Sequence, residues 1–105
     1  MTLSNSFVHH VFFRLKNPSA GGDRDALVAG LKALAELDLI KDHHIGLPAG
    51  TSRDVVDNAY AVSWLAIFAT AADQDAYQAH PIHLEFVKTC SHLWEKVTVY
   101  DSIKA

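Results

Sequence analysis

The sequence predicts one α+β domain whose elements follow the order β-α-β-β-α-β. Runs rich in aromatic and β-branched residues indicate strands, and they alternate with stretches whose apolar residues recur at helical spacing. The chain has 105 residues, the length of one domain, and half of them are apolar, which is ordinary globular composition. The predicted order is the ferredoxin-like arrangement, a four-stranded antiparallel sheet with its helices on one face.

The predicted domain spans residues 7–105. The residues before it, 1–6, are polar, and we expect them to be flexible. Residues 7–15 carry apolar side chains at both odd and even positions, which is typical of a strand buried on both faces. A helix is then expected from Asp23, as its capping residue, to about Leu37.

The middle of the chain predicts an edge strand and a central strand joined by a long connection. Residues 39–47 are polar in their centre, which favours the sheet edge, whereas residues 59–69 form the most apolar strand and are placed centrally. The connection, residues 46–58, is long for a compact domain. It is therefore either a mobile arm or part of a binding site.

The second half predicts two helical segments and a final strand over residues 96–101. Thr70 caps a short helix that runs to about Ala79. Pro81 suits the first turn of a new helix, where its missing N–H would have no partner anyway, and His80 is its expected cap. The apolar stripe expected on that helix consists of Ile82, Phe86, Cys90 and Leu93.

One face of the predicted sheet is apolar and has no helix to cover it. On the first strand the uncovered positions are Val8, His10 and Phe12. On the central strand one face carries Tyr60, Val62, Trp64 and Phe68, and the other carries Ala61, Leu65 and Ile67. A monomer seldom leaves such a face exposed to water, so we expect a homodimer that packs through the open sheet face.

Composition excludes several classes of function. The net charge is −3 and the nine Lys and Arg residues are scattered, so no nucleic-acid partner is expected. The longest apolar run, residues 60–72, is shorter than the roughly 20 residues of a membrane span. Together with a single cysteine and a start unlike a signal peptide, this predicts a cytoplasmic protein without membrane association.

Several stretches resemble the stress-responsive dimeric α/β-barrel (Dabb) domain family over about residues 7–101. They are the first strand His9-His-Val-Phe-Phe-Arg-Leu-Lys16, the Lys41-Asp42…Gly46 pattern, and His80-Pro-Ile-His…Trp94…Tyr100-Asp101. The resemblance implies a homodimer with a cavity in each subunit between sheet and helices. Members include a polyketide cyclase and heat-stable plant stress proteins, while most have no settled activity.

The resemblance to the polyketide cyclase also implies site residues. The second histidine of His-Pro-x-His, the acid/base residue, is His83 here, and the tyrosine six positions before it is Tyr77. A histidine early in the first strand corresponds to His9, whereas the cavity histidine expected on the third strand is replaced by Val62. This departure argues against an identical substrate and mechanism.

Each candidate also has a purely structural interpretation. His83 is either a general acid/base, neutral in an apolar cavity, or a packed histidine bonded to a backbone carbonyl. Tyr77 is either a donor to a developing enolate oxygen or an amphipathic core residue. His9 either assists at the site or is a satisfied core histidine, and Cys90 is expected to be a buried apolar residue rather than a nucleophile.

We expect no metal and no cofactor. His80 and His83 are helical neighbours, but a zinc site needs a third and usually a fourth ligand, and no His-Glu-x-x-His pattern is present. His9, His10, His43 or His44 could in principle supply a further ligand, but His43 and His44 point to opposite faces of an edge strand, so at most one of these two could share such a site.

The function predicted is a small dimeric domain with a cavity for a hydrophobic small molecule. If it is catalytic, it performs cofactor-independent acid/base chemistry on a carbonyl compound, as a cyclase, lyase or isomerase. The alternative is a non-catalytic dimer that binds a hydrophobic ligand or acts in a stress response. Haem-dependent monooxygenase chemistry is the third and least favoured interpretation.

Overall fold

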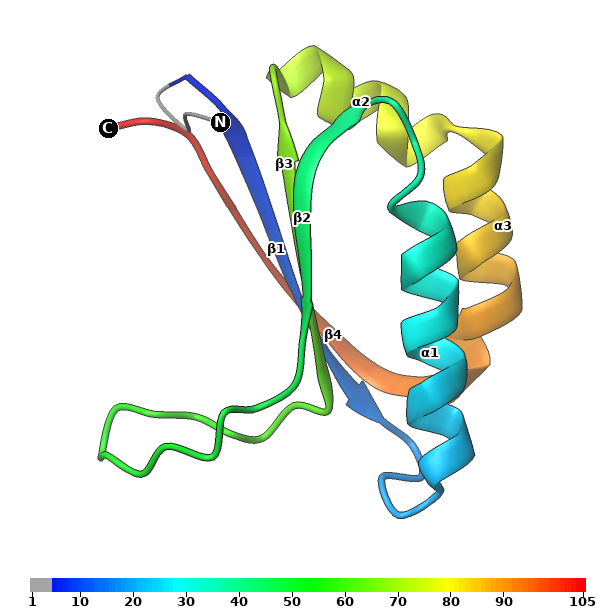
Figure 1. Cartoon of the computed structure of the whole chain (residues 1–105), viewed down its shortest axis with the longest axis vertical. Helices are drawn as coiled ribbons and strands as arrows, with labels where there is room; N and C mark the ends of the chain where they lie inside the picture. The colour runs from blue at the N-terminus through cyan, green and yellow to red at the C-terminus, as the bar shows by residue number, and fades with distance from the viewer. Residues whose placement is uncertain (1–4) are drawn as a thin grey trace.

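The computed structural model describes residues 5–105, which form a four-stranded antiparallel sheet with all three α-helices on one side (Figure 1). The predicted flexibility of the N-terminus concerns mainly residues 1–4, which lie outside the described range. The elements in chain order are β1 (Phe7–Leu15), α1 (Gly21–Leu34), β2 (Ile40–Gly46), β3 (Val62–Phe68), α2 (Ala71–Ala79), α3 (Pro81–Cys90), the 3₁₀ turn η1 (Ser91–Leu93) and β4 (Trp94–Ser102).

The strand order β2-β3-β1-β4 confirms the ferredoxin-like fold. β2 lies at one edge and β3 in the interior of the sheet, both as expected. β1 pairs with β3 on one side and with β4 on the other, so His10 lies between Leu65 and Tyr100. Residues opposite each other in antiparallel strands share a face, which allows the two faces of the sheet to be assigned from this register.

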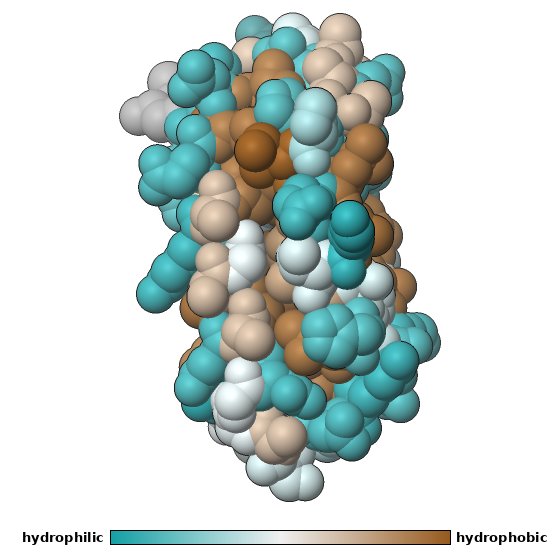
Figure 2. Space-filling view, turned by 90° about the vertical axis from the view of Figure 1, so that its right-hand side faces the viewer, coloured by the Kyte–Doolittle hydropathy of each residue, from teal (hydrophilic) through white to brown (hydrophobic). Residues whose placement is uncertain are grey.

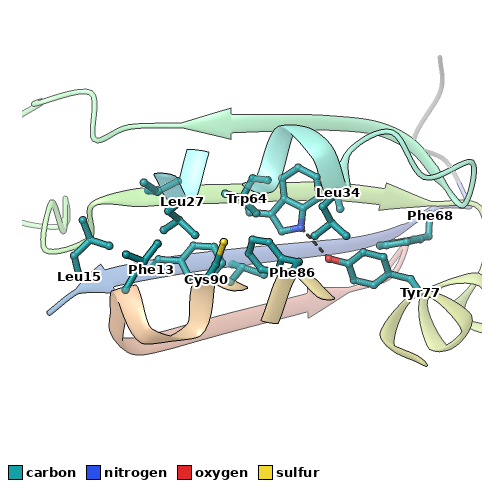
Figure 3. Packing of buried hydrophobic residues seen from close by; sticks show 14 residues of the cluster. Phe13, Leu15, Leu27, Leu34, Trp64, Phe68, Tyr77, Phe86 and Cys90 are labelled. Atoms are coloured by element: carbon teal, nitrogen blue, oxygen red, sulfur yellow. Dashed lines mark hydrogen bonds between the residues drawn. The ribbon is translucent and has the colours of Figure 1, made fainter. Parts of the chain in front are cut away.

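The hydrophobic core lies between the sheet and the helices, and Figure 3 shows its packing. Alternate residues of β1 and β3 point into it and meet the buried leucines of α1 together with Phe86 and Cys90 of α3. The prediction that Cys90 is a buried residue is confirmed.

The second crossover is made of two helices because of the sequence His80-Pro81. Proline cannot donate to the preceding helix, and the residue before it is held in an extended conformation. The His80 side chain caps the new helix by accepting a hydrogen bond from the backbone N–H of Ile82 at 3.0 Å. Thr70 caps α2 in the same manner, accepting from the N–H of Asp73 at 3.1 Å. All of these helix starts were predicted correctly.

Two predictions about the helices were wrong. α1 begins at Gly21, two residues before Asp23, and Ala20 precedes it without a side-chain cap. Asp23 therefore lies inside the first turn, where a carboxylate favours the helix dipole instead. Ile82 is 46% exposed and does not belong to the buried stripe of α3. Figure 2 shows the molecule from the side of the helices, where apolar and polar residues alternate in patches.

The prediction that Tyr60 shares a face of the sheet with Val62, Trp64 and Phe68 was also wrong. β3 begins only at Val62, so the alternation of the strand does not extend back to Tyr60. Its ring packs edge-on against Phe12 with centroids 5.0 Å apart, on the side of the sheet opposite the helices. Ala61 instead packs against the core.

Residues 47–61, which we call the arm, connect β2 to β3 and contain no helix or strand. Figure 1 shows the arm leading away from the helices, on the open side of the sheet. Within residues 5–105, no helix is both long and apolar enough to cross a membrane.

Candidate active site

His9 lies on the helix-facing side of β1 and is held by a carboxylate from β4. The antiparallel register places Asp101 directly opposite it, and His9 Nδ1 lies 2.6 Å from Asp101 Oδ1. An ionised carboxylate only accepts hydrogen bonds, so Nδ1 carries the hydrogen and the other ring nitrogen of a neutral imidazole is the basic one. The His9 side chain is almost fully buried, whereas Asp101 reaches solvent.

Tyr77 comes from α2 and packs beside His9. The ring centroids of the two residues are 5.9 Å apart, and Tyr77 is 1% exposed. Its hydroxyl accepts a hydrogen bond from Trp64 Nε1 at 3.2 Å, drawn as a dashed line in Figure 3. Burial raises the pKa of Tyr77 to about 12, while the hydrogen bond from Trp64 lowers it in part. The hydroxyl is therefore protonated at neutral pH and can donate its own hydrogen.

His83 follows in the first turn of α3, with its ring centroid 4.6 Å from that of Tyr77. The cap at His80 and the proline after it fix where this turn begins, so His83 is directed back at α2. Its Nδ1 is buried and has no hydrogen-bond partner within the described part of the chain. Burial lowers the pKa of His83, a backbone contact with Gln78 raises it in part, and the neighbouring His9 lowers it further.

The structure thus brings together all three residues expected at the site, which we call the acid-base site: His9, Tyr77 and His83. They come from β1, α2 and α3, and both imidazoles pack beside the Tyr77 ring. A protonated phenol flanked by two imidazoles provides one hydrogen-bond donor and two groups that can accept a proton.

Val62 does not belong to this group of residues. It pairs with Phe13, whereas the residue of β3 opposite His9 is Ala66. Four residues along a strand correspond to about 13 Å. The position at which the family resemblance implied a further histidine is therefore at the other end of the sheet.

The aromatic packing around the site is close. Phe68 lies 4.9 Å from Tyr77 between ring centroids, and Phe86 lies 6.4 Å from His83. The two pockets that stand out on residues 5–105 are lined by other residues and lie toward the arm. To reach the acid-base site, a substrate would therefore have to displace the surrounding aromatic side chains or the start of α3 at Pro81.

The remaining histidines are dispersed. His43 and His44 lie on opposite faces of β2, as expected, opposite Ala66 and Leu65 respectively. Among the residues that the structure describes, no group of three or more His, Cys, Asp or Glu side chains is arranged to hold a metal ion.

The sequence interpretation missed the parts played by Asp101 and Trp64. Asp101 was noted only as a family marker, yet pairing the end of the last strand with the start of the first one brings it to His9. That pairing follows from the ferredoxin-like topology and could have been used. Trp64 was noted only as one of the residues on a face of the central strand, and nothing in its local sequence indicates the hydrogen bond to Tyr77.

Solved structures with the same fold match nearly the whole chain. A hydroxynitrile lyase from Passiflora edulis is 22% identical, with a TM-score of 0.82 over 96% of this chain and 94% of that one. A Dabb family protein with a ferredoxin-like fold from Mesorhizobium loti is 22% identical, with a TM-score of 0.79 over 97% of this chain and 99% of that one.

A dimeric ferredoxin-like protein of unknown function from Thermobifida fusca is 16% identical, with a TM-score of 0.78 over 98% of this chain and 94% of that one. The search of curated proteins finds no match. The family model of the stress-responsive α/β barrel domain (Dabb) matches residues 7–104. This chain therefore belongs to the stress-responsive α/β barrel domain family.

Proposed function

We propose that the acid-base site performs cofactor-independent proton transfer on a carbonyl compound. The observation that carries this proposal is the buried Nδ1 of His83, which lacks a hydrogen-bond partner in the described chain and belongs to a ring whose centroid lies 4.6 Å from that of Tyr77. Buried polar atoms are nearly always paired, so an unpaired nitrogen next to a phenol calls for a functional explanation. The lowered pKa of His83 keeps the imidazole neutral at pH 7, ready to accept a proton.

The residues divide the work in an aldol-type reaction. His83 removes a proton from the carbon next to a carbonyl group, and Tyr77 donates a hydrogen bond to the enolate oxygen that forms. The enolate carbon then bonds to a second carbonyl, and the imidazolium returns the proton to the resulting alkoxide. His9, positioned by Asp101, assists as a second proton acceptor. No external oxidant or reductant is needed.

The hydroxynitrile lyase among the similar structures supports carbonyl chemistry as the class to test first. A hydroxynitrile is the adduct of a carbonyl compound with hydrogen cyanide. In its cleavage a base takes the hydroxyl proton, the bond to the nitrile carbon breaks as the carbonyl forms, and the departing cyanide is protonated, so no oxidant or reductant is needed. At 22% identity the likeness shows the fold alone, so the reaction of that enzyme is a starting point for assays of this chain.

We also propose that the chain is a cytoplasmic homodimer that packs through the open face of its sheet. Val8, Phe12 and Leu65 are only partly covered there, and Tyr100 is 65% exposed. Similar structures from two bacteria are described as dimeric ferredoxin-like proteins. A second copy would remove this apolar surface from water.

A non-catalytic role is the second candidate, and the burial of Tyr77 favours it. With Tyr77 only 1% exposed and its hydroxyl already bonded to Trp64, a packed core accounts for the same contacts. In this case the dimer binds a hydrophobic metabolite or acts in a stress response without turnover.

Assays of the purified protein with a panel of carbonyl-derived compounds distinguish the two candidates. The panel contains mandelonitrile, as a hydroxynitrile, and a linear poly-β-ketone. Catalysis predicts formation of benzaldehyde or of a cyclised product above the rate in buffer. Binding without conversion of any compound in the panel would favour the non-catalytic role.

A further inference from the structure

Two histidines flank Leu65 on the open face of the sheet. Leu65 of β3 lies opposite His44 of β2 on one side and opposite His10 of β1 on the other. The three residues therefore form one row across this face, and the backbones of the two histidines are two strand spacings apart, about 10 Å. The row belongs to the surface that the proposed second copy covers.

The neighbours of His10 on this face carry no carboxylate. Tyr100 of β4 lies opposite it, and Val8 and Phe12 are the next residues of β1 on the same side. The His10 ring packs against the Phe12 ring with centroids 4.3 Å apart. The next residues of β3 and β4 on this face are also uncharged: Ser63, Ile67, Thr98 and Ser102. A neutral imidazole suits these neighbours, whereas an imidazolium has no counter-ion beside it.

Charged residues of the open face lie farther from His10. Asp42 precedes His44 by two residues on β2, and its carboxylate accepts a hydrogen bond from the next backbone N–H at 2.9 Å. Because β3 separates Asp42 from β1, this carboxylate can compensate a charge on His44 but not one on His10. Arg14 and Lys96 pair four residues further along β1, about 13 Å away, and both are positive.

A single subunit already disfavours a proton on His10. Burial lowers the pKa of His10, and the imidazoles of His44 and His9 lower it further. His44 shares the row with His10, whereas His9 lies on the other face of β1. A partner that covers the row removes more water from His10, and loss of water disfavours the charged form of an imidazole. The dimer therefore requires the neutral form.

Symmetry doubles this requirement. A two-fold dimer brings the same patch from both copies together, so two residues from each subunit place four of these imidazoles in one interface. We propose that acidification dissociates the dimer by protonating His10, with a smaller contribution from His44, an inference that rests on the proposed dimer through the open face. At a pH below about 6.5, where histidine ordinarily titrates, separated subunits bind protons that the dimer must release, so the equilibrium shifts toward monomers.

Sedimentation equilibrium of the wild type at about pH 7.5 and about pH 5 measures the dissociation constant of the dimer. For each imidazole that has to lose its proton, this constant rises up to about tenfold per pH unit below the pKa. We expect an increase of at least about tenfold between the two pH values. The monomers are expected to keep the far-UV circular dichroism of the dimer. Monomers that appear only with loss of that signal would assign the dissociation to unfolding and overturn the proposal.

Two variants of His10 locate the proton. His10→Leu and His10→Gln are uncharged at every pH, so either is expected to remove most of the increase in the dissociation constant. His44→Gln is expected to remove a smaller part, because Asp42 lies on the same strand. His92→Gln, at an exposed histidine of η1, is the control and should behave as the wild type. A wild-type pH dependence in both His10 variants would contradict the assignment.

The outcomes separate this inference from the dimer on which it rests. A monomer at about pH 7.5 would overturn the proposed dimer and the pH dependence together. A dimer that has the same dissociation constant at both pH values would leave the dimer in place and overturn the inference alone.

Discussion

Burial governs the proton chemistry of single side chains on the helix side of the sheet. Tyr77 and His83 are in contact, and burial acts on both by disfavouring the charged form. It raises the pKa of the phenol and lowers the pKa of the imidazole, so both residues are neutral at pH 7. A neutral donor beside a neutral acceptor suits acid/base work without net charge in the core.

The lowered pKa of His83 has a consequence for stability. Because the folded state holds this proton less tightly than the unfolded state, stability is complete above the unfolded pKa of 6.5 and falls as the pH drops below it. The pKa of His10 is also lowered, by burial and by its histidine neighbours, and it acts in the same direction.

We therefore expect the free energy of unfolding to be lower at about pH 5 than at about pH 7.5, and His83→Asn to remove part of this difference. Urea denaturation of the wild type and the variant at both pH values measures this difference in the free energy of unfolding. His92→Asn, which changes an exposed histidine in η1, is the matched control. An unchanged pH dependence in His83→Asn would show that this imidazole is not shielded from solvent.

The helices illustrate which local features the sequence predicts. Side-chain caps and proline act within three residues of a helix start, so α2 and α3 were placed within one residue from Thr70, His80 and Pro81. The cap of α1 could not be predicted in this way, because Ala20 offers no side-chain acceptor. Exposure of Ile82 depends on how α3 lies on the sheet, which helical periodicity alone does not determine.

The packing of α1 on α3 depends on Gly30. A Cβ added there would lie 2.7 Å from Cys90 Sγ and 3.3 Å from the ring of Phe86. The close approach of a second helix to Gly30 is not visible in the sequence.

Gly30→Ala is therefore expected to destabilise the fold by about 1–3 kcal/mol through steric overlap, although alanine is the better helix former. Thermal or urea denaturation measures this. Gly22→Ala in the same helix has open space around it and should be neutral or stabilise by about 0.5–1 kcal/mol. If Cys90→Ala does not reduce the cost of Gly30→Ala, the overlap with the sulfur is not its cause.

At the scale of the whole molecule, the two faces of the sheet have different roles. One is covered by the helices and carries the proposed acid-base site, and the other carries the proposed dimer surface. The topology and the faces of β1 were predictable from alternation and element order, so His9 was placed correctly. The face on which Tyr60 lies could not be predicted in this way. Tyr60 precedes β3, which begins at Val62, so the alternation of a strand does not apply to it.

The dimer proposal predicts the effect of a charge on the open face. Leu65 lies in the middle of it, next to His10 and His44. Leu65→Lys should convert a dimer into a monomer in sedimentation equilibrium, because it leaves an unpaired charge in the interface. Leu84→Lys, at a residue of α3 that is 56% exposed, should leave the dimer intact. A dimer that survives Leu65→Lys would place the interface elsewhere.

The proposed acid-base role of His83 is tested most directly with whichever compound of the carbonyl panel the wild type converts, by comparing its turnover by the wild type, His83→Ala and the exposed-histidine control His92→Ala. Removing a positioned general base costs about 10²–10⁴-fold in rate, so we expect kcat to fall by that factor in His83→Ala and to remain unchanged in His92→Ala. Equal kcat values for the wild type and a folded His83→Ala variant would contradict the proposed role of this residue.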